Sequence, residues 1–117
     1  MTMTKLEIII RPDKLEKLKM ILNEISIGGM TVTSVMGCGN QKGRMDVDNL
    51  KGLKVSGMNL IPKIMAMVVV NDKDVDTILA AIHSEISTGT VGDGKVFISK
   101  VDDCMRIRTG ERGKKSI

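Results

Sequence analysis

The hydrophobic pattern of this chain repeats a strand–helix–strand unit twice, and the first unit lies before residue 37. An apolar run at residues 6–10 predicts a strand, and apolar residues at helical spacing over 15–25 predict a helix. Residues 30–36 alternate apolar and small polar side chains, as a half-buried strand does. We expect Asp13 to cap the start of the helix and Gly28-Gly29 to end it.

The second unit repeats this order. Residues 62–70 and 95–101 predict strands on either side of a helix over 75–86. Two such units, joined with right-handed crossovers, predict an α+β, ferredoxin-like β-α-β-β-α-β sandwich with both helices on one face of an antiparallel sheet. Because residues 6–10, apart from Glu7, and residues 65–70 are apolar at consecutive positions, we expect the other face to be covered by further copies of the chain.

Composition narrows the classes of function. The 117 residues are enough for one domain and include one phenylalanine, no tyrosine and no tryptophan. This argues against single-stranded nucleic-acid binding, which uses aromatic side chains to stack bases. The net charge of +4 is spread along the chain, which favours small anions or an acidic partner surface over DNA. Cys38 and Cys104 lie too far apart to indicate a zinc site.

The N-terminal residues and the lengths of the apolar runs indicate the expected compartment. No apolar run reaches the roughly 18 residues of a membrane-spanning helix, and no signal-peptide pattern opens the chain. We therefore expect it in the cytoplasm.

Three glycine-rich or basic motifs carry the candidate chemistry. Residues 37–43 fit either a phosphate-binding loop or a hinge, and residues 92–95 fit either a turn or a backbone anion cradle. Residues 106–108 place two arginines on one side of an extended segment, either as a polyphosphate clamp or as a solvated strand end. Together they suggest a nucleotide-phosphate site. The lone histidine, His83, has no catalytic partners in the pattern, so no enzyme is predicted.

Between these motifs lies a segment without periodicity. Residues 39–59 are rich in glycine, lysine, aspartate and asparagine. A loop of this length in a small domain is either functional or disordered.

At these motifs the chain resembles the PII signal-transduction proteins, the nitrogen regulatory P-II family. The resemblance covers nearly the whole chain, and the two motifs nearest the C-terminus are its most specific part. The residues that carry it are 5–12, 29–33, 39–43, 62–63, 88–95 and 106–111.

The resemblance implies a single PII-type domain over residues 1–117 that assembles as a homotrimer. The implied T-loop spans about residues 39–59, the B-loop about 88–95 and the C-terminal segment about 105–117. ATP or ADP is expected to bind between subunits, with 2-oxoglutarate beside MgATP.

The resemblance also assigns ligand contacts. Those to the nucleotide are Ile9, Thr31, Gly37, Cys38, Gly39, Gln41, Val69, Gly92, Asp93, Gly94, Lys95, Arg106 and Arg108. Those to 2-oxoglutarate are Arg11, Gln41, Lys42, Gly43 and Lys63, and Gln41 is also the expected Mg²⁺ ligand.

The implied function is to sense nitrogen, carbon and energy status and to regulate partners through the T-loop. The expected partner is an ammonium transporter or a nitrogen-assimilation enzyme, with membrane contact only through a transporter and no nucleic acid. The alternatives are a nitrogenase-directed relative and a slow ATPase or phosphatase. The loop has no tyrosine, so uridylylation is not expected, and Asn40 stands where relatives often carry arginine.

Overall fold

The computed structural model describes residues 3–38 and 60–117, and the predicted helices and strands occur there in the predicted order. A 3-10 turn precedes each helix, and another lies near the C-terminus. The strands are β1 (Met3–Ile10), β2 (Thr31–Gly37), β3 (Ile61–Asn71) and β4 (Gly94–Val101); the helices are α1 (Leu15–Glu24) and α2 (Val75–Ile86); the turns are η1 (Pro12–Lys14), η4 (Asp72–Asp74) and η5 (Gly113–Ser116).

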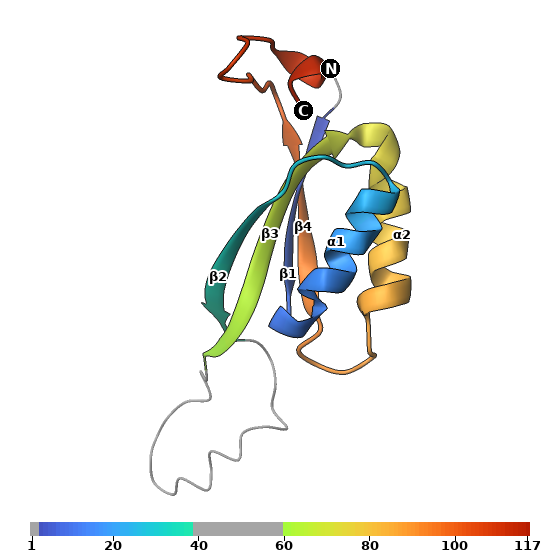
Figure 1. The fold of residues 1–117 in the computed structure, drawn as a ribbon. Coiled ribbons are helices and arrows are strands. Elements are labelled where there is room, and N and C mark those ends of the chain that lie inside the picture. The colour runs from blue at the N-terminus through green and yellow to red at the C-terminus, as the bar shows by residue number, and fades with distance from the viewer. Residues whose placement is uncertain (1–2, 39–59) are drawn as a thin grey trace, which may run out of the picture.

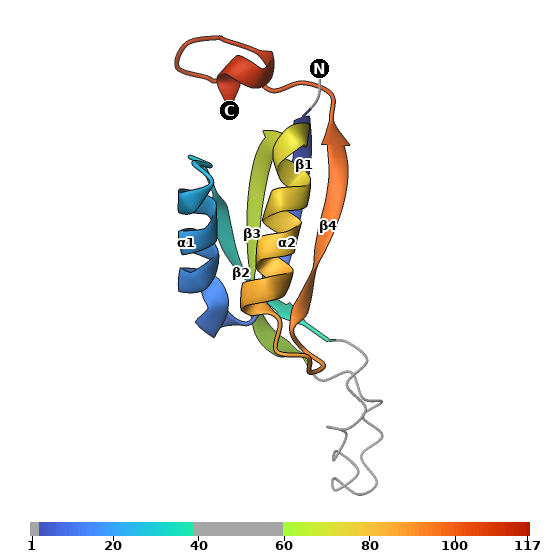
Figure 2. The same cartoon turned by 90° about the vertical axis from the view of Figure 1, so that its right-hand side faces the viewer.

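The four strands form one antiparallel sheet in the order β2-β3-β1-β4. Both helices pack on the same face of this sheet, as Figures 1 and 2 show. The two described ends of the chain lie at one end of the sheet, and the connections from β1 to α1 and from α2 to β4 lie at the other (Figure 1). The predicted α+β, ferredoxin-like architecture is confirmed.

The core lies between the helices and the sheet and is aliphatic. Alternate residues of β1, and of β3 from Ala66 to Val70, face the helices and are at most 2% exposed, because successive strand side chains point to opposite faces. The buried cluster consists of Leu6, Ile8, Ile10, Leu18, Ile21, Leu22, Ala66, Val68, Val70, Ile78, Ile82 and Ile86.

The start of α1 differs from the prediction. Asp13 lies inside η1, and Lys14 occupies the N-cap position without a side-chain hydrogen bond. Pro12 fixes the backbone at the first position of η1, so this turn occupies residues 12–14. The helix follows it in the chain and begins at Leu15. The expectation that Asp13 caps the helix was wrong.

The end of α1 comes before Gly28-Gly29. The last helical residue is Glu24, and Ser26 takes a left-handed conformation with φ of 66°. The Ile27 amide then donates a 2.9 Å hydrogen bond to the Leu22 carbonyl, which closes a Schellman-type cap. A serine therefore fills the position that glycine usually takes, and the two glycines lie beyond the helix.

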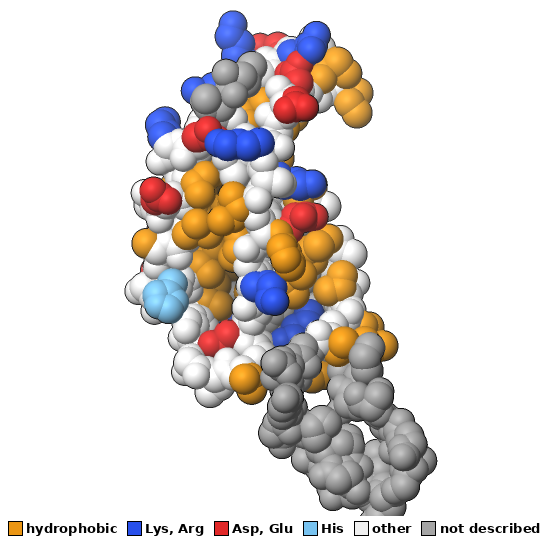
Figure 3. All heavy atoms as spheres, turned by 180° about the vertical axis from the view of Figure 1, so that it is seen from behind, with side chains coloured by type: hydrophobic (Ala, Val, Ile, Leu, Met, Phe, Trp, Pro, Cys, Tyr) orange, Lys and Arg blue, Asp and Glu red, His pale blue; other side chains and the backbone are white. Residues whose placement is uncertain are grey.

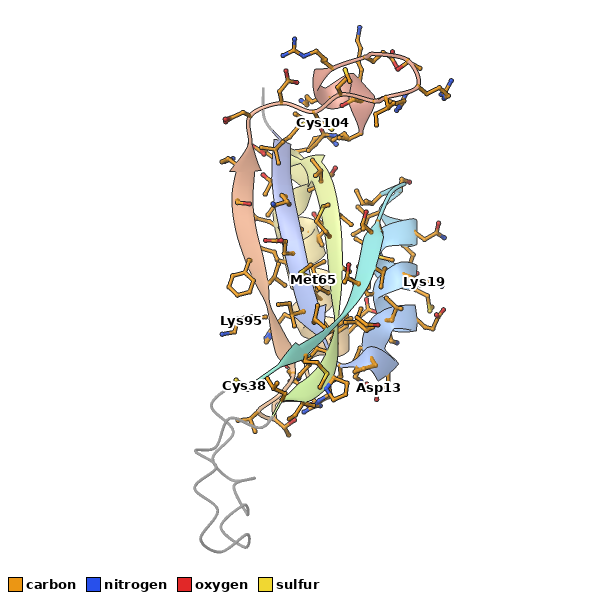
Figure 4. The ribbon with its side chains drawn as sticks, turned by 90° about the vertical axis from the view of Figure 1, so that its left-hand side faces the viewer. Asp13, Lys19, Cys38, Met65, Lys95 and Cys104 are labelled. Atoms are coloured by element: carbon orange, nitrogen blue, oxygen red, sulfur yellow. The ribbon has the colours of Figure 1, made fainter. Side chains whose placement is uncertain are left out.

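The sheet face opposite the helices carries a mixed surface. Ile9, Met65, Met67 and Val69 are half-buried there, and neither α1 nor α2 covers them (Figure 4 labels Met65). Oligomerisation through this face stays a prediction.

The outer edge of the sheet is also apolar. Among the described strands β4 pairs with β1 alone, and its Phe97 and Ile98 are 51% and 54% exposed. Figure 3 shows hydrophobic side chains gathered over β4 and the neighbouring helix α2. Among the described residues, no helix is long and apolar enough to cross a membrane.

Candidate functional site

Four strand ends and one loop meet at the end of the sheet away from the termini. β1 ends at Ile10 and β2 at Gly37, while β3 begins at Ile61 and β4 at Gly94. The segment that joins α2 to β4, here called the 87–94 loop, closes this end (Figure 1). Two of the three predicted motifs therefore begin or end within one small region.

Glycine is required at the last position of this loop. Gly94 has φ of 109°, and a Cβ there would overlap the backbone carbonyl of Ile9. Gly92 and Gly89 also have positive φ, of 96° and 84°. The turn that residues 92–95 predicted is present, and its role as an anion cradle stays a prediction.

Asp93 organises the loop from inside. Its Oδ2 accepts hydrogen bonds from the amides of Thr88 (2.7 Å) and Gly89 (3.0 Å), and its Oδ1 accepts one from the Thr88 hydroxyl (2.6 Å). These bonds, led by the one from the Thr88 hydroxyl, lower the pKa of Asp93 to about 2. The carboxylate is thus an anion that the loop itself satisfies.

Arg11, just past the end of β1, donates hydrogen bonds to the same loop. One guanidinium nitrogen donates to Asp93 Oδ1 (3.2 Å), and the other donates to the Val91 carbonyl (2.8 Å) and to the Thr90 hydroxyl (3.3 Å). Arg11 precedes Pro12, so its backbone is extended, with φ of −67° and ψ of 146°.

Lys63, near the start of β3, reaches the loop from a third strand. Its Nζ donates a 2.6 Å hydrogen bond to the Gly92 carbonyl. Partial burial, followed by the positive charge of Arg11, lowers its pKa from the usual 10.5. A Cβ at Gly37 would lie 3.6 Å from the Lys63 side chain, so the first glycine of the 37–43 motif also lies against this lysine.

Arg11, Lys63 and the 87–94 loop are together called the loop cluster. Two cations and one carboxylate leave it with an excess of positive charge, and Lys95 follows directly in β4. Figure 4 places Lys95 and Cys38 toward this end of the sheet. An anionic ligand is the electrostatic complement of such a cluster.

A hollow lies at the opposite end of the sheet from the loop cluster, under the C-terminal segment. Its volume is about 660 Å³, and it lies between the 26–31 segment, the last residues of β3 and the C-terminal residues. Thr31, Val69 and Arg106, all predicted nucleotide contacts, line it. It is here called the C-terminal groove.

The C-terminal segment forms a turn whose two ends are paired with each other. An isolated bridge pairs Met105 with Arg112, whose guanidinium also binds Asp103. The Arg106 guanidinium donates to Glu111 (3.0 Å). Residues 107–109 form a turn, so the extended segment expected at 106–108 is not found, and Arg108 is exposed.

The predicted nucleotide residues therefore fall into two groups within one chain. Gly37, Gly92, Asp93 and Gly94 belong to the loop cluster end, while Arg106 lies at the end marked by Cys104 in Figure 4. The length of β4 separates them, about 23 Å for seven residue steps. One copy of the chain does not bring its glycine loop together with Arg106 and Arg108.

Several predicted contacts lie outside the described residues. These are Gly39, Gln41, Lys42 and Gly43, and with them the expected Mg²⁺ ligand; Asn40 lies there too. Within residues 3–38 and 60–117, no three His, Cys, Asp or Glu side chains come together as a metal site requires.

The sequence reasoning missed the hydroxyl groups of the loop. Thr88 and Thr90 bond to each other and connect Asp93 with Arg11. The signal was present as two threonines around Gly89, followed by an aspartate. Such residues satisfy backbone groups locally in turns.

Comparison with known proteins gives a family match over most of the chain. The model of the family "Nitrogen regulatory protein P-II" matches residues 3–111. The P-II 2 protein of Methanothermobacter thermautotrophicus is 45% identical over 115 residues, covering 98% of this chain and 97% of the relative. The P-II protein of Rhizobium meliloti is 39% identical, covering 98% and 100%.

Solved structures give the same result. The B. subtilis GlnK–ATP complex superposes with a TM-score of 0.81 at 32% identity, covering 99% of this chain and 96% of that one. Arabidopsis thaliana PII bound to citrate superposes with a TM-score of 0.77 at 31% identity, covering 99% and 92%.

Proposed function

Because the chain belongs to the nitrogen regulatory protein P-II family, we propose that it is an ATP- or ADP-binding sensor that also responds to 2-oxoglutarate. The family is one of regulatory proteins, not of enzymes. In this proposal the protein assembles as a homotrimer, and each nucleotide lies between two copies.

The observation that carries the proposal is the separation of the two half-sites. The loop cluster offers a glycine loop and lysines, which suit phosphates, and the C-terminal groove offers Thr31, Val69 and Arg106. Placing the groove of one copy against the loop cluster of the next would unite them in one site. The half-buried apolar residues on the uncovered sheet face would be covered by the same assembly.

The ATP-bound relative supports nucleotide binding at this fold. In the proposed site, Gly92, Gly94 and Lys95 contact the β- and γ-phosphates, with Arg106 and Arg108 supplied by the neighbouring copy. Ile9, Thr31 and Val69 lie around the adenine. Glycines allow the backbone amides to approach phosphate closely, and arginine binds it through a planar fork.

The dicarboxylate 2-oxoglutarate is proposed to bind beside the phosphates at Lys63. This ammonium lies at the edge of the loop cluster and is partly desolvated, which strengthens its attraction for a carboxylate. The citrate complex of the plant relative supports the binding of small carboxylates within the family.

Ligand binding would then be read out through the segment that joins β2 and β3. Each ligand combination favours a different population of conformations through its contacts at the base of this segment, and no chemical step is needed. The proposed partner is an ammonium transporter or a nitrogen-assimilation enzyme; a nitrogenase-directed role is the second candidate.

A calorimetric titration with MgATP, in the presence and absence of 2-oxoglutarate, tests this proposal. We expect saturable MgATP binding that tightens when 2-oxoglutarate is present, because reciprocal coupling follows from adjacent sites. Binding without coupling would leave an energy sensor that lacks the nitrogen signal. No MgATP binding would contradict the proposal.

A further inference from the structure

We propose that Arg11 is a positioning residue: it holds the 87–94 loop in its phosphate-binding conformation through Asp93, Thr90 and Val91. The inference rests on the proposed function of the loop cluster. It differs from the role that the sequence resemblance implies for this arginine.

The Arg11 guanidinium is already hydrogen-bonded to the 87–94 loop. Three acceptors on the loop, a carboxylate, a carbonyl and a hydroxyl, lie within 3.3 Å of its two terminal nitrogens. These three acceptors come from residues 90, 91 and 93, so Arg11 binds the loop along its length. These contacts use three of the five N–H donors of the guanidinium, including both donors of one terminal nitrogen.

Arg11 also compensates the negative charge of Asp93. This carboxylate lies in the loop that is proposed to bind phosphates, and its pKa of about 2 keeps it ionised at neutral pH. An uncompensated anion there would repel a polyphosphate. The Arg11 guanidinium at 3.2 Å, with a side chain 34% exposed, compensates it.

The backbone that carries Arg11 is held in place by the turn that follows it. Arg11 is followed by Pro12 and by η1, and the Lys14 amide donates a 3.0 Å hydrogen bond to the Arg11 carbonyl. The arginine therefore projects from a fixed backbone, and Asp93 in turn fixes the amides of Thr88 and Gly89. This chain of contacts transmits the position of β1 to the loop.

The experiment compares Arg11→Lys, Asp93→Asn and the double variant with the wild-type oligomer. Lysine keeps the charge but loses the planar fork. We expect Arg11→Lys to weaken MgATP binding about tenfold. The double variant should lose less affinity than the sum of the two single losses, because both changes break the Arg11–Asp93 pair. A role in positioning the loop predicts this loss of MgATP affinity also when 2-oxoglutarate is absent.

Hydrogen exchange without ligand gives an independent readout. Arg11→Lys should speed exchange at the Thr88 and Gly89 amides, while exchange in α1 stays unchanged. Lys19→Gln is the matched control, since it breaks an exposed ion pair with Glu16 on α1, and it should change neither readout. If Arg11→Lys fails to fold, Thr90→Val removes one contact and should weaken MgATP binding about threefold.

Three results would overturn the inference: unchanged MgATP affinity in Arg11→Lys, additive losses in the double variant, or a loss confined to 2-oxoglutarate. Absence of MgATP binding by the wild type would instead contradict the proposed function. The exchange measurement needs no ligand, so it would still decide whether Arg11 holds the loop.

Discussion

Lys63 and Gly92 are joined across the end of the sheet by a 2.6 Å hydrogen bond from the lysine Nζ to the glycine carbonyl. The bond ties the start of β3 to the loop before β4, which lies 29 positions further along the chain. A carboxylate that binds Lys63 would compete with this carbonyl. The lysine is thus placed to couple dicarboxylate binding to the conformation of the 87–94 loop.

Lys63→Met tests that coupling. The change keeps the aliphatic stem and removes the ammonium, so we expect 2-oxoglutarate affinity at saturating MgATP to fall about tenfold to a hundredfold. MgATP affinity measured alone should fall less. Lys73→Met, which removes an exposed lysine beside Asp74, is the control. Equal losses for the two ligands would contradict a direct role of Lys63 at the dicarboxylate.

Asp93 gives a prediction for pH. Its folded pKa of about 2 lies below the ordinary 3.8, so it stabilises the fold at pH values above 3.8 and loses this contribution as the pH falls toward 2. Asp93→Asn should therefore make the free energy of unfolding depend less steeply on pH in that window. Denaturant titrations at a series of pH values measure the slope. An unchanged slope would show that the carboxylate gains nothing from the loop.

Gly94→Ala probes the close approach of the loop to β1. Its φ of 109° and the overlap of a Cβ with the Ile9 carbonyl predict a loss of about 1–3 kcal/mol in the free energy of unfolding. Gly28→Ala, where a Cβ would meet nothing within 4 Å, should change stability by less than about 0.5 kcal/mol. Equal effects in denaturant melts would refute the steric explanation.

Ser26→Gly tests the C-cap of α1. Serine in the left-handed region costs roughly 1 kcal/mol relative to glycine, so the variant should unfold at a higher denaturant concentration. Lower stability would show that the serine makes a compensating contribution.

The sequence predicted the fold well because the two repeated units are strongly periodic. It failed at the ends of α1, where local geometry decides. Pro12 begins a 3-10 turn before the helix, and Ser26 takes a conformation that a reader of the sequence would assign to glycine. Neither alternative changes the hydrophobic spacing on which the prediction rests.

The candidate site was predicted only in part. Residues 92–95 were predicted as a turn or an anion cradle, but the contact of Asp93 with Arg11 depends on tertiary proximity across 82 positions. The contacts of Asp93 with Thr88 depend on the conformation of the loop. The turn at 107–109 depends on the bridge between Met105 and Arg112. Spacing along the chain carries none of this information.

The central claim is that the nucleotide site is shared between two copies, and mixed oligomers test it most directly. Lys95→Ala removes the proposed phosphate contact beside the loop cluster, and Arg106→Ala removes the one in the C-terminal groove, so each variant alone should bind MgATP weakly. Co-expressed in equal amounts, the two chains should restore about one site in four, because a ring of head-to-tail interfaces then pairs an intact Lys95 with an intact Arg106 at that frequency. Calorimetry on the purified mixed oligomer that recovers about a quarter of the wild-type stoichiometry would confirm a shared site. No recovered high-affinity binding would contradict it.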